Sequence, residues 1–397
     1  MIKRTLQELC LNITDGKHGD CENEENSGYY FISCKDIFDG QINYKNARQI
    51  TKADFEETHK RTMLEVDDIL LTNSGTIGRM AFVTDREATT KTTFQKSVAI
   101  IKPDKQKVLP RYLYYQLQNC VPQFINSSNG SAQKNLLLST MRTFQIEIEE
   151  NREKQEKIAN TLSAYDDLIE NNQKQIKLLE EAAQRLYKEW FVDLRFPGHE
   201  ITKIVDGVPE GWSKSTVGNI CKLRKVVITP DKIESNTPYI GLEHMPRNDI
   251  CLSTWGKSEE INSNKFIYLK KDVLFGKIRP YFHKVGFALN DGITSTDTMV
   301  MVADQNLWGL LLVTVSSDAF VDFSYQNCKE GAKMPRADWK QMEKYAIMIA
   351  DQATQKLFEQ EILVITNKIS ALAFQCRSLR EARDRMLPKL MGGEVEV

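Results

Sequence analysis

Several chemical signatures are missing from this chain of 397 residues. Its eight cysteines are scattered without a Cys-x-x-Cys pair or a zinc-finger spacing, so we expect buried, reduced thiols and no metal site. No uninterrupted apolar stretch approaches the roughly 20 residues that a membrane span needs. Residues 1–4 are followed by polar positions rather than by the apolar core of a signal peptide. These absences predict a water-soluble, cytoplasmic protein.

Motifs for three kinds of catalysis on nucleic acids are also missing. A methylase that uses S-adenosylmethionine needs a glycine-rich turn and an Asn/Asp-Pro-Pro-aromatic loop, and the chain contains no Pro-Pro. The Pro-Asp dipeptides at 103–104 and 230–231 are not followed nearby by the Glu/Asp-x-Lys of a metal-dependent nuclease. No Gly-x-x-x-x-Gly-Lys-Ser/Thr loop for ATP is present. We therefore expect no catalysis by the isolated chain.

Charge is nearly balanced in total but unevenly distributed. The net charge is −1, yet segment 265–284 has six Lys or Arg against one acid. Segment 214–232 has five against one, and segment 86–107 has six against two, whereas 147–170 is acidic. A charged run is usually a solvated face. Three basic stretches nevertheless favour a polyanionic partner, because Lys and Arg supply most of the non-specific affinity for DNA.

The chain also contains an internal repeat. Four pairs of segments match in order: 3–10 with 214–221, 68–71 with 272–275, 130–134 with 331–335, and 179–185 with 379–385. The offset shrinks along the chain, which indicates that the second copy has shorter loops. Each half is therefore a globular block followed by one helix.

The globular blocks are predicted to be α+β domains with long loops. Short apolar runs rich in β-branched residues, which favour strands, lie at 69–71, 98–101, 266–269 and 299–302. Turn sequences such as Asp-Gly, Asn-Gly and Asn-Ser-Gly lie at 15–16, 39–40, 73–75, 129–130 and 291–292.

Two long helices are predicted from apolar positions that alternate steps of three and four residues. The first seam runs from Ile158 to Trp190 with Asn172 as its polar member, and the second runs from Phe358 to Leu390 with Arg383. Matching seams in one chain most simply pair with each other, so we expect an antiparallel coiled coil of helices on the order of 50 Å long. Asn172 fits either a buried position that sets the register or a position that faces solvent.

The predicted fold class is thus α+β, with two similar globular domains separated by two long antiparallel helices and related by an internal pseudo-two-fold repeat. The expected boundaries are 1–150 for the first domain, 151–197 for a central helix, 198–346 for the second domain and 347–397 for a C-terminal helix.

Four strings in the sequence resemble the specificity (S) subunit of Type I restriction-modification systems. They are DILLTNSGTIG at 68–78, LEEA at 179–182, PEGW at 209–212 and RDRMLPKLMGGE at 383–394. Each string is moderately specific, and together with the duplicated order of block and helix they form a strong resemblance over the whole chain. One departure is Gly392-Gly393, where Ser-Gly is more usual.

This resemblance implies two target-recognition domains that each read one half of a bipartite double-stranded DNA sequence. The paired helices would set the spacing of the half-sites and dock two modification (methyltransferase) subunits. S-adenosylmethionine would be bound by those partners, and ATP and Mg²⁺ by restriction (motor-nuclease) subunits where these are present. No cofactor or metal is expected on this chain, and the missing catalytic motifs agree with that division.

DNA-contacting residues are predicted from their chemistry, because Arg and Lys pair with guanine, Asn and Gln pair with adenine, and loops carry such contacts. In the first block the candidates are Lys17, His18, Asn73, Ser74, Thr76, Lys91, Thr93, Gln95, Gln133 and Lys134. In the second block they are Arg224, Lys225, Lys277, Arg279, Tyr281, Lys284, Lys329, Lys333 and Arg336. The alternative for each is an ordinary exposed loop residue, and for Tyr281 also a core position. The acidic segment 20–25 is expected to face solvent.

A second function class stays open at this stage, namely a coiled-coil scaffold whose two globular ends bind proteins. The Lys and Arg clusters favour DNA recognition. Salt distinguishes the two, because an interface that contacts phosphates loses affinity steeply as the salt concentration rises.

Overall fold

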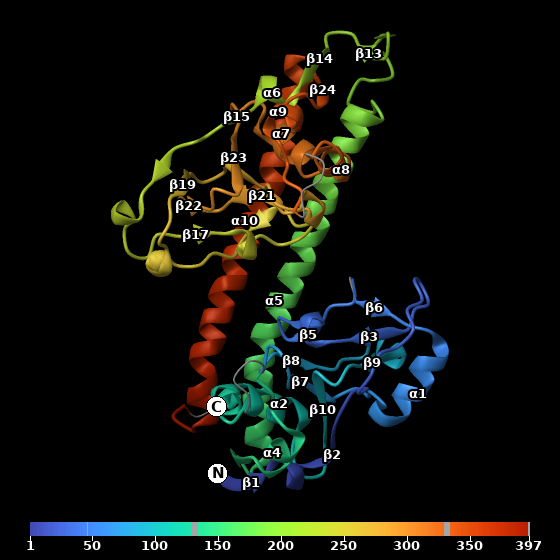
Figure 1. The fold of residues 1–397 in the computed structure, drawn as a ribbon, viewed down its shortest axis with the longest axis vertical. Helices are drawn as coiled ribbons and strands as arrows, with labels where there is room; N and C mark the ends of the chain where they lie inside the picture. The colour runs from blue at the N-terminus through green and yellow to red at the C-terminus, as the bar shows by residue number, and fades with distance from the viewer. Residues whose placement is uncertain (46, 129–133, 329–333, 396–397) are drawn as a thin grey trace. The chain divides into compact units, whose positions relative to one another are not determined.

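The computed structural model describes residues 1–45, 47–128, 134–328 and 334–395. The chain divides into two compact units, Met1–Asp167 with Arg380–Val397, and Leu168–Leu379. Each unit combines an α+β domain with portions of two long helices (Figure 1). The predicted α+β class with two long helices is confirmed.

The first domain is built on an antiparallel sheet with the strand order β2-β10-β7-β8. These strands are β2 (Cys10–Asp15), β7 (Ile69–Thr72), β8 (Met80–Phe82) and β10 (Val98–Pro103). Ile69, Leu70 and Leu71 have no exposed surface, so both faces of the sheet are covered. The strands predicted at 69–71 and 98–101 are therefore confirmed.

Shorter elements surround this sheet. β3 (Tyr30–Ile32) pairs parallel with β9 (Thr92–Phe94) and antiparallel with β6 (Arg48–Gln49). The other strand pairs are β1 (Ile2–Thr5) with β11 (Gln145–Ile148), and β4 (Ile37–Phe38) with β5 (Gln41–Ile42). The helices are α1 (Lys52–Thr62), α2 (Pro110–Asn119), α3 (Val121–Asn126) and α4 (Leu138–Thr143), with 3-10 turns η1 (Leu6–Leu9), η2 (Cys34–Asp36) and η3 (Thr89–Lys91). Tyr112 and Tyr115 of α2 are fully buried in the core.

The second domain repeats this plan. Its main sheet has the order β15-β23-β20-β21-β18, with β15 (Lys222–Leu223), β18 (Cys251–Leu252), β20 (Val273–Gly276), β21 (Val285–Ala288) and β23 (Thr298–Val302). A second sheet has the order β16-β19-β22-β17, with β16 (Val227–Ile228), β17 (Tyr239–Ile240), β19 (Lys265–Tyr268) and β22 (Gly292–Thr294). The predicted strands at 266–269 and 299–302 correspond to β19 and β23 and are confirmed.

The remaining elements of this domain are short. The strand pairs are β12 (Ile204–Val205) with β13 (Val208–Pro209), and β14 (Ser213–Thr216) with β24 (Ala346–Ile349). The helices are α6 (Val217–Ile220), α7 (Trp308–Val315), α8 (Asp318–Gln326) and α9 (Trp339–Met342). The 3-10 turns are η5 (Pro230–Lys232), η6 (Leu242–His244), η7 (Ser258–Glu260) and η8 (Pro280–Phe282).

The repeat extends to individual hydrogen bonds. Asp68, in the turn before β7, accepts a hydrogen bond from the Glu65 backbone N–H at 2.8 Å, and Asp272, before β20, accepts one from Leu269 at 2.8 Å. Each aspartate also pairs with a cation, Lys102 for Asp68 and Arg224 for Asp272. The aspartate that begins the repeated DILL and DVLF strings therefore closes the turn that leads into the central strand.

The long helices match their predicted lengths and begin with equivalent caps. They are α5 (Arg152–Tyr187), followed by a π-helical turn η4 (Lys188–Val192), and α10 (Gln352–Met391). Asn151 Oδ1 accepts hydrogen bonds from the backbone N–H groups of the first turn of α5, and Asp351 Oδ1 does the same for α10. At 1.5 Å per residue these helices are roughly 55–60 Å long.

Contacts within the second unit show that the two helices run antiparallel. Trp190 packs against Phe358 with ring centroids 5.6 Å apart, while Asn172 Nδ2 donates to Gln375 Oε1 at 3.1 Å. Asn172 is 4% exposed, so the buried alternative holds for it and the solvent-facing one is wrong. In the first unit, Arg383 Nη1 lies 2.5 Å from Asp166 Oδ1 on α5, which explains how an arginine fits this seam.

The cysteines form no disulfides, as expected. All eight are unbridged, and six of them are buried. Among the described residues, no helix is both long and apolar enough to cross a membrane.

Candidate nucleic-acid interface

Loops at one edge of the first domain bring four of the predicted DNA contacts together. Lys17, His18, Ser74 and Gln95 line a hollow of about 540 Å³. The loop after β2, the turn η2, the loop after β7 and the turn between β9 and β10 all contribute to its wall. Lys35 and Lys96 line it as well, so the hollow gathers more cationic side chains than the sequence-based list contained.

Backbone pairing explains why these loops meet. The Lys17 N–H donates to Phe94 O at 2.8 Å, and the Lys96 N–H donates to Lys17 O at 3.1 Å. Gly16 makes this approach possible, because a Cβ atom at that position would lie 1.9 Å from Phe94 O. The predicted Asp-Gly turn at 15–16 is therefore a close crossing of two chain segments.

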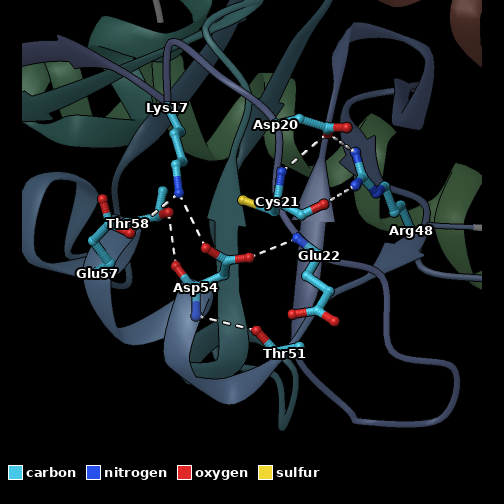
Figure 2. Close-up of polar contacts among 9 residues, drawn as sticks. All are labelled: Lys17, Asp20, Cys21, Glu22, Arg48, Thr51, Asp54, Glu57 and Thr58. Atoms are coloured by element: carbon cyan, nitrogen blue, oxygen red, sulfur yellow. Dashed lines mark hydrogen bonds and ion pairs between the residues drawn. The ribbon is translucent and has the colours of Figure 1, made fainter.

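Figure 2 shows that Lys17 is held by two carboxylates of α1. Its Nζ lies 3.1 Å from Asp54 Oδ1 and 3.2 Å from Glu57 Oε2. The hydrogen bond with Asp54 raises the pKa of Lys17. The hydrogen bond from the Glu22 backbone N–H, and then that from Lys17, lowers the pKa of Asp54. Lys17 is thus charged but already paired, and a phosphate would have to compete with these carboxylates.

The acidic segment 20–25 is fixed beside this cluster. The Arg48 guanidinium pairs with the Asp20 carboxylate and donates to Cys21 O, while the Glu22 N–H donates to Asp54 Oδ2 at 2.6 Å (Figure 2). The Asp20 side chain is 83% exposed, and Glu22, Glu24 and Glu25 are exposed as well. The expectation that these acids face solvent is confirmed.

Two first-domain candidates are corrected. Asn73 is 7% exposed and Thr93 is fully buried, so neither side chain is presented to solvent. Asn73 holds the loop through its backbone, since its N–H donates to Ser97 O and its carbonyl accepts from the Leu136 N–H. The Thr93 hydroxyl lies 3.2 Å from that of Thr62 on α1. Their sequence context resembled a loop, but Thr93 lies in β9 against Thr62 of α1, and Asn73 is buried directly after β7.

The other first-domain candidates differ in their surroundings. His18 Nε2 lies 3.0 Å from Asp15 Oδ2, and the same carboxylate pairs with Arg61. Thr76, Lys91 and Lys134 are exposed. Gln133 lies outside the described residues.

The second domain places its candidate loop at the equivalent position. Ile278 forms a β-bridge with Arg336, as Ser74 does with Asn135 in the first domain. The Lys277 N–H donates to Asp297 O at 2.8 Å. Arg279 has φ = 50°, and Gly75, which is likewise the third residue after its strand, has φ = 79°. The two loops therefore share a left-handed residue although their sequences differ.

Several second-domain candidates are already bonded within the protein. Arg224 Nε lies 2.8 Å from Asp272 Oδ2, and Arg336 Nη2 lies 2.6 Å from Asp297 Oδ1. Lys277 Nζ donates to Thr296 O at 2.7 Å, and burial lowers the pKa of this lysine. Lys284 Nζ donates to Leu242 O. These side chains therefore already bond to other parts of the domain. A ligand could contact only those of their atoms that are exposed to solvent.

Three further candidates have other positions. Lys225 is exposed. Tyr281 is 45% exposed, which excludes the core alternative, and its ring packs against Phe282 and Tyr325. Lys329 and Lys333 lie outside the described residues. Sequence reasoning missed Lys35, whose only distinguishing feature is its spatial neighbourhood, and Lys96, which belongs to the basic segment 86–107.

Comparison with known families finds a match for the first half of the chain. Residues 3–181 match the family described as the Type I restriction modification DNA specificity domain. This segment comprises the first domain with its hollow and most of α5. Residues 3–181 are therefore similar to a DNA specificity domain of the Type I restriction-modification class.

The chain as a whole is similar to specificity subunits of that class. It is 25% identical to the Type I restriction enzyme MjaIX specificity subunit of Methanocaldococcus jannaschii over 92% of this chain and 87% of that protein. It is 28% identical to the EcoBI specificity subunit of Escherichia coli over 43% of this chain and 35% of that protein. A crystal structure of a Type-I restriction-modification system S subunit from M. genitalium shares the fold, with a TM-score of 0.57 at 16% identity over 98% of this chain and 95% of that one. Together these similarities support a specificity subunit, as the sequence strings indicated.

Proposed function

We propose that this chain is the non-catalytic DNA-recognition subunit of a Type I restriction-modification complex, and that each domain reads one half of a bipartite target. The observation that carries this proposal is the repeated loop frame. The same bridges, left-handed residue and turn-closing aspartate occur in both domains, while the side chains on the loops differ. Two equivalent frames with different side chains suit two different half-sites.

The long helices would set the distance between the half-sites and dock two modification subunits. This is supported by the continuity of α5 and α10, each of which contributes residues to both units. It is also supported by unpaired apolar residues on α10, since Leu357 is 48% exposed and Val364 is 66% exposed. Such residues, seven apart on one helix face, suit a helix-packing partner.

Catalysis would belong to the partners. The modification subunits would bind S-adenosylmethionine, and restriction subunits, where present, would use ATP and Mg²⁺. The complex would act in the cytoplasm. The purified chain should then leave DNA unmethylated and uncut, whereas addition of a modification subunit should produce methylation that depends on S-adenosylmethionine. Genome-wide mapping of methylated bases should reveal one split sequence. Methylation by the chain alone, or binding that is insensitive to salt as in a protein scaffold, would refute the proposal.

The spacer role can be tested with matched insertions. A copy of 161–167 inserted after Asp167, together with a copy of 373–379 after Leu379, adds seven residues to each helix at the boundary between the units. Both insertions keep the seam in phase and keep every contact within either unit. The helices lengthen by roughly 10 Å, which equals about three base pairs at about 3.4 Å per step.

The mapped half-sites should therefore move about three base pairs apart. The matched control is either insertion alone, which should disrupt helix pairing and abolish specific methylation. An active double variant with unchanged half-site spacing would show that the helices are not the spacer.

A further inference from the structure

Two arginines from different loops of the second domain meet at one aromatic ring. The guanidinium carbon of Arg247 lies 3.9 Å from the centroid of the Phe282 ring, and that of Arg279 lies 5.7 Å from the same centroid. Arg247 belongs to the segment between η6 and β18, and Phe282 ends η8. Arg247 is exposed and was not among the residues predicted to contact DNA.

Backbone hydrogen bonds hold the two loops together. The Asn248 N–H donates to His283 O at 3.1 Å, directly after Arg247 and Phe282 in their respective loops. The Arg279 N–H donates to Pro335 O at 2.8 Å. Asn248, Arg279 and His283 all have φ between 50° and 59°. Residues other than glycine adopt this left-handed conformation infrequently, so its three occurrences, together with the backbone hydrogen bonds, indicate a defined loop geometry around the two guanidinium groups.

Neither Arg247 nor Arg279 forms an ion pair within the described part of the chain. Arg224 and Arg336 of the same domain are paired with Asp272 and Asp297. For Arg247 and Arg279, by contrast, the side-chain contacts found among the described residues are those with the Phe282 ring.

Lys284 adds a third positive charge. Burial and then the neighbouring Arg247 lower its pKa, although Glu243 opposes them. The neighbourhood therefore holds three basic side chains, with Glu243 as an acid beside them.

A guanidinium stacked on a ring contacts it with its flat face and keeps its N–H groups along the edge. Those donors match the paired oxygens of a phosphate. We propose that Arg247 is a DNA-contacting residue of the second domain that binds a backbone phosphate and is positioned beside Arg279 by the Phe282 ring. This inference rests on the proposed function, since it names a contact of the same DNA interface.

The test uses the full chain and two DNA duplexes. One is selected by the wild-type chain from a random-sequence library, and the other has the same composition in scrambled order. Affinity for both is measured by fluorescence anisotropy over a series of NaCl concentrations. Arg247→Ala should weaken binding to both duplexes by about tenfold, since a hydrogen bond to a charged group is lost. It should also reduce the slope of log affinity against log salt by about 0.9.

Three further variants make the result specific. Arg195→Ala removes one exposed positive charge elsewhere in the same unit and should change neither affinity nor slope. Phe282→Leu keeps an apolar side chain but removes the ring, so it should lower affinity for both duplexes even though both arginines remain. Arg247→Lys keeps the charge but loses the planar fork, and it should bind more weakly than the wild type.

The outcomes separate this inference from the proposed function. If Arg247→Ala bound both duplexes as the wild type does, or lost affinity for the selected duplex alone, Arg247 would not be a phosphate contact. In either case wild-type selection of a split sequence would leave the proposed function standing. A wild-type chain that selected no sequence, alone or with its modification subunit, would contradict the proposed function itself.

Discussion

The loop after β7 and the loop after β20 occupy the same place in the two domains but carry different side chains. Gly75 stands in the first loop where Arg279 stands in the second, and both residues are left-handed. The residue directly before the next strand is nevertheless a cation in both domains. Arg79 donates to Cys34 O and Lys284 donates to Leu242 O, each the first residue of a 3-10 turn. The comparison indicates that the two domains share the backbone conformation of this loop, while the side chains that it exposes differ.

The junctions between helix and domain differ in another way. In the second unit Glu180 of α5 is buried and accepts a hydrogen bond from the Ile250 N–H at 2.8 Å. In the first unit the corresponding helical residue, Arg380 of α10, pairs with Asp39 at a partly exposed position. One junction is therefore a buried carboxylate and the other a surface ion pair, which predicts different responses to mutation and pH.

The largest effect is expected from Gly16→Ala in the first domain. The added Cβ would lie 1.9 Å from Phe94 O, so the crossing between the loops must open. We expect a loss of about 3 kcal/mol or more in the free energy of unfolding of this domain. Hydrogen exchange measured by mass spectrometry should show faster exchange in the first domain and unchanged exchange in the second.

Gly19→Ala is the matched control, because no atom of the described residues lies within 4 Å of a Cβ at that position. Equal effects of the two substitutions would contradict the steric explanation.

The next effect concerns Glu180, whose pKa burial raises to about 7 from an ordinary 4.5. The folded state binds more protons than the unfolded state between these values, so stability should fall as the pH rises from about 4.5 to 7. Above that range the ionised carboxylate should cost about 3 kcal/mol, which Glu180→Gln should recover while keeping the bond from Ile250.

Thermal unfolding at pH 5 and pH 8 checks this prediction. The gain in melting temperature for Glu180→Gln should be large at pH 8 and small at pH 5. Glu181→Gln, at the exposed neighbouring position, should change neither value. A stability gain independent of pH would rule out the titration of Glu180 as its cause.

A smaller effect is expected from Arg279→Gly, which gives the second loop the residue that the first loop has. Glycine adopts φ = 50° without strain, so the fold should be unaffected. Loss of a direct base contact should reduce affinity for the cognate site by about 1–3 kcal/mol and relax preference in one half-site only. Selection of bound duplexes from a random-sequence DNA library measures the sequence preference at both half-sites. An equal loss on cognate and random DNA would instead make Arg279 a phosphate contact.

The smallest effect is expected from Arg380→Gln in the first unit. Its partner Asp39 has a side chain that is 52% exposed, and exposed ion pairs contribute about 0–1 kcal/mol. The change in unfolding free energy should vanish in about 1 M salt, where screening is strong. A loss as large as that predicted for the buried Glu180 junction would show that the two junctions are energetically alike after all.

The candidate site was predictable only in part. Lys17 and His18, Ser74 and Gln95 come from three separate segments of the sequence, and turn chemistry together with polar side chains was sufficient to select them. The pairing of Lys17 with Asp54 and Glu57 could not be predicted, because those acids lie on α1, a separate element. Thr93 was misplaced for a related reason, since its burial depends on the strand and helix that cover it.

The sequence by itself determined the features that depend on local periodicity. The 3.5-residue seam specified two long helices, and the ordered matches between the halves specified a repeat, because both patterns are present along the chain before it folds. Tertiary structure decided which charges are available. It paired Arg224 and Arg336 with aspartates and placed Arg247 against Phe282, because ion pairing and stacking join residues that only folding brings together.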